Sequence, residues 1–221
     1  MENSLRDKKQ PNLVPPWLWR AVVIVLVLVV IMGVTIVLWL GTRPATTGAS
    51  LPLSDLGRWA FGPGAVGEEV DGSITVRAAG KASGLLYAVS EQPLADFAFE
   101  ARAMPLSGPD DIGYGLVVRY RGLDDYVALL IGPDGYIAVG QMSGGEWRWR
   151  VPWQQWPHIK RGSTENLVRA QCRADRCRFY VNDEFAFEVS DVPREGQTGF
   201  AVWNPGGSNV SAAFREWQAW R

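Results

Sequence analysis

The chain is poor in the residues that build metal centres and nucleophilic active sites. Its 221 residues include one histidine, His158, and two cysteines, Cys172 and Cys177. A centre with several histidine ligands is therefore excluded, and a zinc site would lack two of its four ligands. Charge is almost balanced, with a formal net charge of −1. The composition thus gives no argument for a nucleic-acid partner.

The sequence has no convincing amphipathic helix, whereas turn-forming residues are abundant. It contains 24 glycines, 14 prolines and 11 tryptophans, which is typical of a turn-rich β protein. From about Leu56 to Arg221, short segments are broken by Gly, Pro, Asn and Asp. Some alternate in polarity, as in FAFEARA (97–103) and EWRWRV (146–151), and others are apolar runs, as in YVALLIG (126–132). This pattern predicts about eleven or twelve strands arranged as a sandwich or barrel.

One long stretch contains no charge at all, AVVIVLVLVVIMGVTIVLWL from Ala21 to Leu40. As a helix, its twenty residues match the roughly 30 Å hydrocarbon core of a bilayer. Four cations precede it, and Arg43 is the only cation that follows closely, so the positive-inside rule predicts a cytoplasmic N-terminus. A cleaved signal peptide is the competing interpretation, but its apolar core is normally about 7–15 residues long.

The domain organisation follows from these segments. We expect a cytoplasmic tail at 1–20, a transmembrane helix at 21–40, a flexible linker at 41–55 and an extracytoplasmic β-sandwich domain at 56–221. The lipid bilayer is then the first expected partner, through Ala21 to Leu40. The expected location is the cell membrane, with a single pass.

The two cysteines lie in CRADRC, residues 172–177. If Ala174 and Asp175 form a two-residue turn, Cys172 faces Cys177 across a hairpin, with Cα atoms about 4.5 Å apart, which suits a disulfide. One face of that hairpin is then apolar: Val168, Ala170, Cys172, Cys177, Phe179 and Val181. An oxidising compartment also favours a disulfide. A redox-active pair is the weaker alternative, because no helix N-terminus lowers the thiol pKa.

Several segments together resemble a known family. They are DIGYGLVVRYRGLDDYVALLIGPDGYIAVGQ (111–141), NLVRAQC (166–172), CRFYVNDEFAFEV (177–189), GQTGFAVWN (196–204) and VSAAFREWQAW (210–220). Their order resembles the concanavalin A-like jelly rolls of bacterial extracellular proteins, in particular the laminin G-like and family-16-like domains, which include the keto-disaccharide hydrolase-like group. The resemblance covers roughly residues 70–220 and implies an antiparallel two-sheet jelly-roll sandwich.

The sequence departs from that family where function would be expected. The turn after Val181 is Asn182-Asp183 rather than Asn-Gly, and the final strand reads Phe-Arg-Glu-Trp at 214–217. A retaining glucanase of this fold needs two carboxylates about 5 Å apart. Their usual source, Glu-x-Asp-x-x-Glu on one strand, does not occur in the chain. We therefore predict no catalytic residues.

A sugar-binding surface needs aromatic platforms and planar polar side chains. Gly113 and Gly115 are expected to leave a groove on one face of their strand, with Arg119 on the same face. The predicted ligand-binding residues are Arg119, Tyr126, Tyr136, Trp147, Trp149, Trp203 and Asn204. Packing is the alternative for each single tryptophan, because sandwich cores use tryptophan freely.

Calcium is the one cofactor for which the sequence offers ligands. Asp124, Asp125 and Asp134 fall in predicted turns, where aspartate serves turn formation more often than metal binding.

Three functions remain open. The first is a membrane-anchored lectin-like module that recognises a glycan or an envelope component. The second is a single-span accessory subunit of a larger membrane protein complex. The third is a glycoside hydrolase-like enzyme, a function that only the fold resemblance supports.

Overall fold

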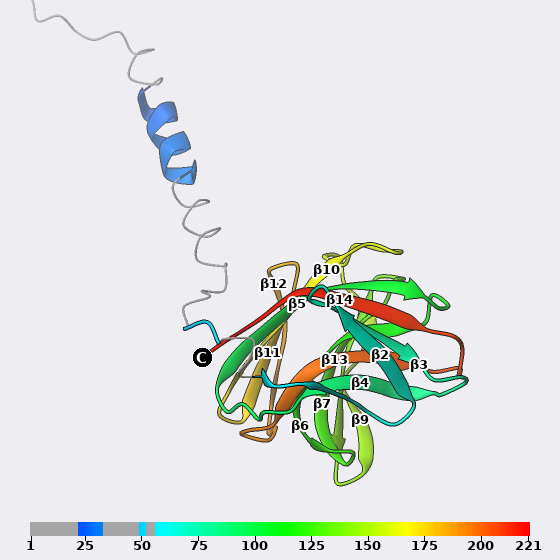
Figure 1. The fold of residues 1–221 in the computed structure, drawn as a ribbon. Helices are drawn as coiled ribbons and strands as arrows, with labels where there is room; N and C mark the ends of the chain where they lie inside the picture. Colours follow the sequence, from blue (N-terminus) through cyan, green and yellow to red (C-terminus); the bar gives the residue numbers. More distant parts are fainter. Residues whose placement is uncertain (1–21, 33–48, 52–55) are drawn as a thin grey trace, which may run out of the picture. The chain divides into compact units, whose positions relative to one another are not determined.

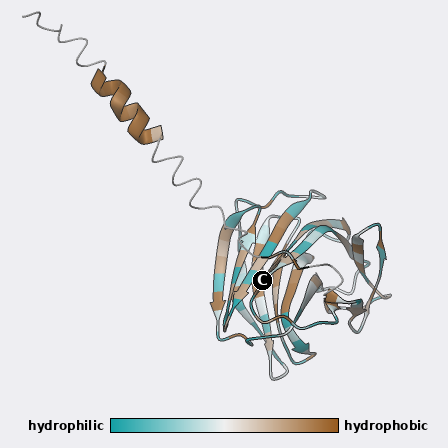
Figure 2. Cartoon of the chain, turned by 60° about the vertical axis from the view of Figure 1, so that its left-hand side comes forward, coloured by the Kyte–Doolittle hydropathy of each residue, from teal (hydrophilic) through white to brown (hydrophobic). Residues whose placement is uncertain are grey.

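The structure is a computed structural model that describes residues 22–32, 49–51 and 56–221. The chain divides into two units, Met1–Pro44 and Ala45–Arg221. In the first unit, residues 22–32 form a helix of apolar residues (Figure 2). Over the described residues, no helix has the length and apolar character needed to cross a membrane. The rest of the predicted span at 21–40, the tail at 1–20 and most of the linker at 41–55 lie outside the described residues.

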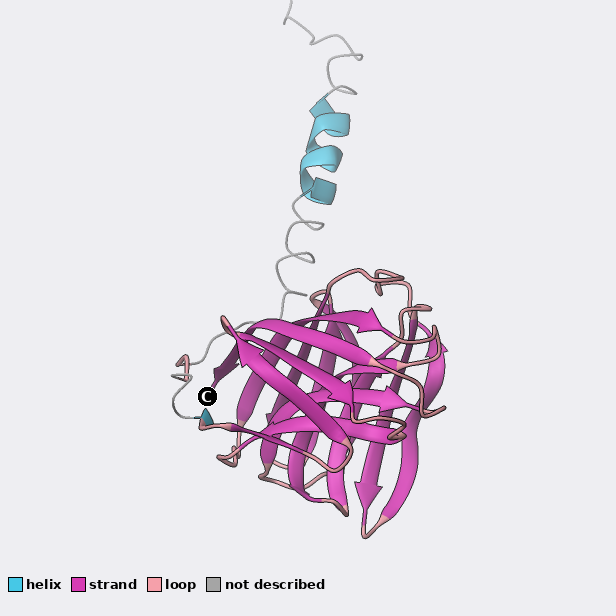
Figure 3. Ribbon diagram, turned by 45° about the vertical axis from the view of Figure 1, so that its right-hand side comes forward, coloured by secondary structure: helices cyan, strands magenta, loops and turns pink. Residues whose placement is uncertain are grey.

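In the second unit, fourteen strands form two antiparallel sheets of seven strands each (Figures 1 and 3). The first, here called the front sheet, has the order β1 (Trp59–Phe61), β4 (Gly84–Ser90), β13 (Gln197–Asn204), β6 (Gly113–Gly122), β7 (Asp125–Ile131), β8 (Tyr136–Ser143) and β9 (Glu146–Gln155). The second, the back sheet, has the order β12 (Glu184–Ser190), β11 (Arg176–Val181), β10 (Asn166–Arg173), β5 (Phe97–Ser107), β14 (Ser211–Trp220), β3 (Ser73–Ala78) and β2 (Ala65–Val70).

The main core lies between the two sheets, and strand alternation decides which residues enter it. In β6, Tyr114, Leu116 and Val118 point into this core and are fully buried. The intervening residues of each front-sheet strand point to the outer face, because successive side chains alternate in a strand. The front sheet thus has two distinct faces, and its outer face carries a second cluster of apolar and aromatic residues.

The two-sheet antiparallel sandwich predicted from the sequence is confirmed. The patterns recognised in the sequence correspond to β5 through β14. The strand count exceeds the expected eleven or twelve because residues 59–90 supply four further strands, β1 to β4.

The hairpin of β10 and β11 has the predicted register. Cys172 pairs with Cys177, and Arg173 pairs with Arg176. The two cysteines form a disulfide with a Cα–Cα distance of 4.1 Å. The polarity of the two faces was therefore sufficient to align these strands, because a shift of one residue would have moved every apolar side chain out of the core.

The end of β14 pairs with a segment from the start of the second unit. Ser50 forms a bridge with Trp220, and the amide of Leu51 donates to the carbonyl of Ala219 at 2.8 Å. In the other direction, the amide of Arg221 donates to the carbonyl of Ala49 at 3.1 Å. These bonds fix the position of the last residues of β14.

Candidate ligand-binding face

Aromatic side chains from five strands gather on the outer face of the front sheet. We call this group the aromatic face, and it consists of Tyr87, Tyr120, Tyr126, Trp147, Trp149, Trp153 and Trp203. They come from β4, β6, β7, β9 and β13. Tyr87 and Tyr126 are buried, whereas the other five are partly exposed. Five rings of the face are therefore accessible to solvent in part, whereas the rings of Tyr87 and Tyr126 are not.

The seven rings form one connected network. Trp147 stacks on Trp203 with ring centroids 5.6 Å apart and an interplanar angle of 10°. Trp149 contacts both of them edge to face, at 5.1 and 5.5 Å. Trp153 adjoins Trp149 at 5.7 Å, and Tyr126 adjoins Trp147 at 6.1 Å. Tyr126 links the tryptophans to the two remaining tyrosines.

The stacking of Trp147 on Trp203 brings together rings from strands that are far apart in the front sheet. The two residues belong to β9 and β13, which are four places apart in the sheet. On a flat sheet that would separate the strands by about 19 Å. Their rings nevertheless meet, because both side chains lean over the strands between them and the twisted sheet bends toward them.

Small residues beneath the rings permit this arrangement. The floor consists of Gly113, Gly115, Ala128, Gly140 and Ala201, all on strands between or beside the tryptophans. A Cβ atom on Gly140 would overlap the ring of Trp147, and one on Gly113 would lie 2.9 Å from the ring of Trp153. The glycine groove expected from the sequence thus exists, but tryptophan rings lie in it.

Polar groups on the aromatic face are few and well defined. The hydroxyls of Tyr87 and Tyr120 are hydrogen-bonded at 2.9 Å. Burial raises the pKa of Tyr126 to about 12 and also raises the pKa of Tyr87. Both phenols therefore stay neutral at physiological pH. The indole N–H of Trp147 is buried and has no acceptor among the described residues, which leaves one donor unsatisfied.

Arg119 does not lie on this face, which corrects the expectation from the sequence. Strict alternation would have put Arg119 with Gly113 and Gly115, and Tyr120 with the core. Instead Arg119 has a φ of 56°, and the pairing of β6 with β7 shifts register between Val118 and Gly122. This irregularity changes which face of the sheet the side chains after Val118 point to. As a result, Arg119 is fully buried and Tyr120 joins the aromatic face.

The buried guanidinium of Arg119 acts as a clamp between three segments. It donates to the carbonyls of Leu94 and Ala174, both at 3.0 Å, and to that of Ala95. It also lies 5.3 Å from the ring centre of Phe97. Burial lowers the pKa of Arg119, while nearby carboxylates oppose that shift. Arg119 thus holds backbone together and is not accessible to a ligand.

Asn204 is also placed differently from the prediction. It is fully buried at the end of β13, where its amide donates to the carbonyls of Ala82 and Ser208 at 2.7 and 2.8 Å. Its side chain therefore shapes a turn. Tyr136, which begins β8, is partly exposed but has no ring contact with another aromatic residue in the described part of the chain.

Each of the three aspartates considered as calcium ligands makes a contact of its own with another residue. The carboxylate of Asp125 pairs with Arg121, and that of Asp134 accepts the amide of Tyr136 at 3.1 Å. The backbone carbonyl of Asp124 accepts the amide of Gly145. Within the described residues, no group of three or more acidic, histidine or cysteine side chains is close enough to hold a metal ion.

Four of the seven predicted ligand-binding residues therefore meet on one surface, namely Tyr126, Trp147, Trp149 and Trp203. The prediction omitted Tyr87, Tyr120 and Trp153. Trp153 could have been found from its clustering with Trp147 and Trp149. Tyr87 and Tyr120 could be assigned only once the strand order and the irregularity at Arg119 were known.

The comparisons with known proteins show the fold. No family model and no curated protein matches the chain. Solved structures do match, among them the carbohydrate-binding module CBM66 from Bacillus subtilis, with a TM-score of 0.60 and 16% identity over 74% of this chain and 95% of that one. A Bacillus licheniformis β-glucanase matches with a TM-score of 0.55 and 11% identity, covering 79% of this chain and 99% of that one.

A third match is a Bacillus subtilis protein described as having a galectin-like fold. Its TM-score is 0.53 and its identity 14%, over 78% of this chain and 96% of that one. The chain thus has a jelly-roll-like two-sheet sandwich similar in fold to a carbohydrate-binding module, a β-glucanase and a protein with a galectin-like fold. At these identities the likeness concerns the fold alone.

Proposed function

We propose that this protein is a carbohydrate-binding module whose ligand lies along the aromatic face. The observation that carries the proposal is the connected network of seven rings, five of them partly exposed, over a floor of glycine and alanine. Rigid aromatic side chains provide large contact areas at low entropic cost, and most small-molecule sites combine them with a few polar groups. The C–H-rich faces of a sugar ring suit such a surface.

Two polar features support a ligand that carries hydroxyl groups. The unsatisfied N–H of Trp147 is buried, so a ligand hydroxyl could serve as its acceptor only if a ring of the face moves aside. The paired hydroxyls of Tyr87 and Tyr120 retain unused hydrogen-bonding capacity, since each hydroxyl offers one donor and two acceptor positions. Both features favour a sugar over a purely apolar ligand.

Binding is favoured over hydrolysis by the sequence. The strand motif that usually supplies the two carboxylates of a glucanase of this fold, Glu-x-Asp-x-x-Glu, does not occur in the chain. Hydrolysis of a glycosidic bond by the usual route requires an acid and a second carboxylate beside the scissile bond. The remaining alternative is an accessory subunit of a membrane protein complex, and a glycan array distinguishes this function from glycan binding.

The test is binding of the full-length chain to a glycan array, followed by titration with the best glycan. Trp149→Ala removes a ring that contacts three others on the face, and Gly140→Ala displaces Trp147. We expect each change to weaken binding by at least about tenfold, since a lost aromatic contact costs about 0.5–1.5 kcal/mol beyond its buried area. The matched control is Phe185→Ala, because Phe185 is 51% exposed on β12 in the other sheet.

The outcomes are distinct. Saturable binding that survives Phe185→Ala and is lost in both other variants supports the proposal. Absence of binding to every glycan would refute it and favour the accessory subunit, which should then co-purify with partner proteins. Repeating the titration with a calcium chelator tests whether a calcium ion takes part in binding.

We extend the proposal to the location of the domain. Residues 21–40 serve as a single-pass anchor, and the β-sandwich lies on the extracytoplasmic side. The uncharged stretch and the preceding cations support this arrangement, and a disulfide between Cys172 and Cys177 persists best in an oxidising space. Alkaline carbonate extraction of native membranes tests it, because an anchored chain stays in the pellet and a released chain would contradict the anchor.

A further inference from the structure

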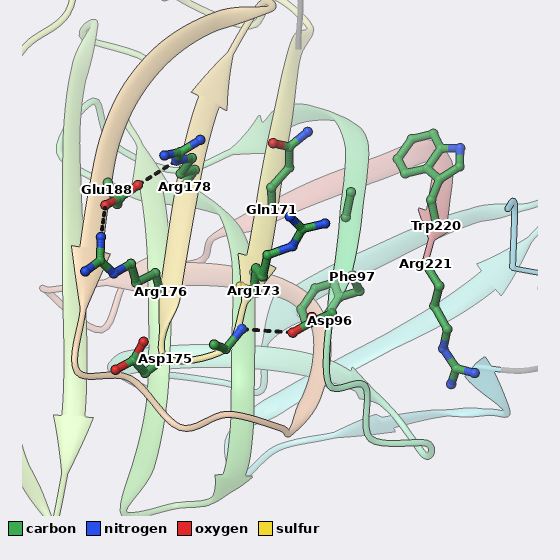
Figure 4. Close-up of a pocket in the computed structure, with 13 residues that line it drawn as sticks. Asp96, Phe97, Gln171, Arg173, Asp175, Arg176, Arg178, Glu188, Trp220 and Arg221 are labelled. Carbon is green, nitrogen blue, oxygen red and sulfur yellow. Dashed lines mark hydrogen bonds and ion pairs between the residues drawn. The ribbon is translucent and has the colours of Figure 1, made fainter. Parts of the chain in front are cut away.

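A second cavity lies on the opposite side of the sandwich, over the outer face of the back sheet. It has a volume of about 540 Å³. Its walls come from β5, β10, β11, β12 and β14 and include the turn of the disulfide hairpin (Figure 4). None of the seven residues of the aromatic face lines it. The cavity is therefore a separate feature from the proposed glycan site.

One row of residues across four neighbouring strands forms the base of this cavity. Trp220 on β14 pairs with Ala98 on β5, and Ala98 pairs with Gln171 on β10. Gln171 pairs in turn with Arg178 on β11. Since Ala98 is the small residue in the row, it leaves a gap with the indole of Trp220 on one side and the amide of Gln171 on the other.

Charge in the cavity is unevenly paired. Four arginines and three carboxylates line it. Glu188 accepts from Arg178 at 2.5 Å and pairs with Arg176 at 3.4 Å (Figure 4). The hydrogen bond from Arg178 is the main cause of the lowered pKa of Glu188. That carboxylate is thus already occupied.

The other two arginines, and likewise the carboxylates of Asp96 and Asp175, form no ion pair among the residues that the structure describes. These arginines, Arg173 and Arg221, are exposed. Arg173 extends from the β10 end of the hairpin, and Arg221 lies next to Trp220 on the far side of the gap (Figure 4). Two free guanidinium groups therefore lie on either side of an aromatic ring and an amide.

The turn that carries Arg173 is held in place from both sides. The amide of Ala174 donates to the carboxylate of Asp96 at 2.8 Å, and its carbonyl accepts from the buried Arg119 at 3.0 Å. Ala174 has a φ of 50°, in the left-handed region that non-glycine residues rarely adopt. Together with the disulfide, these contacts fix the backbone, so that binding would not have to order this wall of the cavity.

From this arrangement we propose that the cavity is a second binding site, for a sugar ring that carries a carboxylate. The indole of Trp220 would support one face of the ring. The amide N–H groups of Gln171 can donate to ring hydroxyls, while its Oε1 already accepts from the hydroxyl of Tyr180 at 3.2 Å. A carboxylate matches the planar donor pair of a guanidinium, here that of Arg173. A neutral sugar would leave both arginines unpaired, and a simple anion would not use Trp220.

The test is calorimetric titration of the full-length chain with galacturonate oligomers. Matched galactose oligomers and inorganic phosphate serve as the neutral and the simple anionic probes. The variants are Arg173→Gln, Trp220→Leu and the control Arg77→Gln, because Arg77 is exposed on β3 of the same sheet and does not line the cavity. We expect galacturonate binding to fall at least about tenfold in Arg173→Gln, the loss of one charge-assisted hydrogen bond, and to persist in Arg77→Gln.

The remaining outcomes are decisive as well. Binding that weakens with added salt and is lost in Trp220→Leu, with the unfolding midpoint retained, supports a stacked acidic sugar. Equal affinity for galactose oligomers, or equal affinity for phosphate, would overturn the proposal. Galacturonate binding that survives Arg173→Gln but is lost in Trp149→Ala would also overturn it, and would assign the acidic sugar to the aromatic face.

Discussion

Replacement of Arg119 by methionine tests the assignment of this residue as a buried clamp. The change keeps a long side chain but removes three hydrogen bonds. The carbonyl of Leu94 retains the amide of Gly196 as a donor at 3.1 Å. Over the described residues, the carbonyls of Ala95 and Ala174 have no donor other than Arg119. Ala95 and Ala174 are exposed, so water can replace part of these bonds. The expected loss is therefore about 2–3 kcal/mol, near the value of one hydrogen bond to a charged group.

The measurement is urea-induced unfolding followed by tryptophan fluorescence. Arg121→Met is the matched control on the same strand, because Arg121 is 54% exposed and pairs only with the carboxylate of Asp125. Such a surface pair contributes about 0–1 kcal/mol. If the two variants lose similar free energies of unfolding, the clamp has been misassigned. If Arg119→Met keeps full stability and loses glycan binding instead, Arg119 is a ligand residue as the sequence suggested.

Two further predictions concern stability. Replacing Cys172 and Cys177 by alanine should lower the free energy of unfolding by about 2 kcal/mol, because the disulfide closes only a short loop; an unchanged value in the same urea assay would argue against the entropic reasoning. The pKa of Tyr126 is raised from 10.0 to about 12 in the folded state, so the unfolded chain loses this proton first. The contribution of this raised pKa to the free energy of unfolding is fully present below pH 10. It decreases as the pH rises toward 12, and about 1.4 kcal/mol has been lost at pH 11. Tyr126→Phe should show a correspondingly smaller loss between pH 8 and pH 11, and an identical loss would contradict the assignment.

The hairpin of β10 and β11 illustrates what sequence alone can establish. Its two strands are adjacent in the chain, and the polarity of their faces changes completely with register. Cys172 and Cys177 add a second constraint on the same alignment. Local information was therefore sufficient to predict both the pairing and the disulfide.

Arg119 and Tyr120 illustrate what sequence alone could not establish. Alternation along β6 was a sound guide up to Val118, and it failed where the strand meets the loop at Leu94 and Ala95. The irregularity there is stabilised by carbonyl groups that are distant in sequence, so no local pattern reveals it. Asn204 is a similar case in part, because one of its acceptors, Ala82, is distant in sequence, whereas the other, Ser208, is only four residues away.

The position of β14 has a consequence for the order in which the protein can fold. β14 lies between β5 and β3 inside the back sheet, yet it comes last in the sequence. Until residues 211–220 leave the ribosome or the export channel, β5 and β3 each present an unpaired edge. Pairings of such long sequence separation form slowly, and open edges are sites of aggregation. Synthesis of the whole domain must therefore precede closure of the back sheet, during which time the local β10–β11 hairpin and the β6–β9 meander can already form.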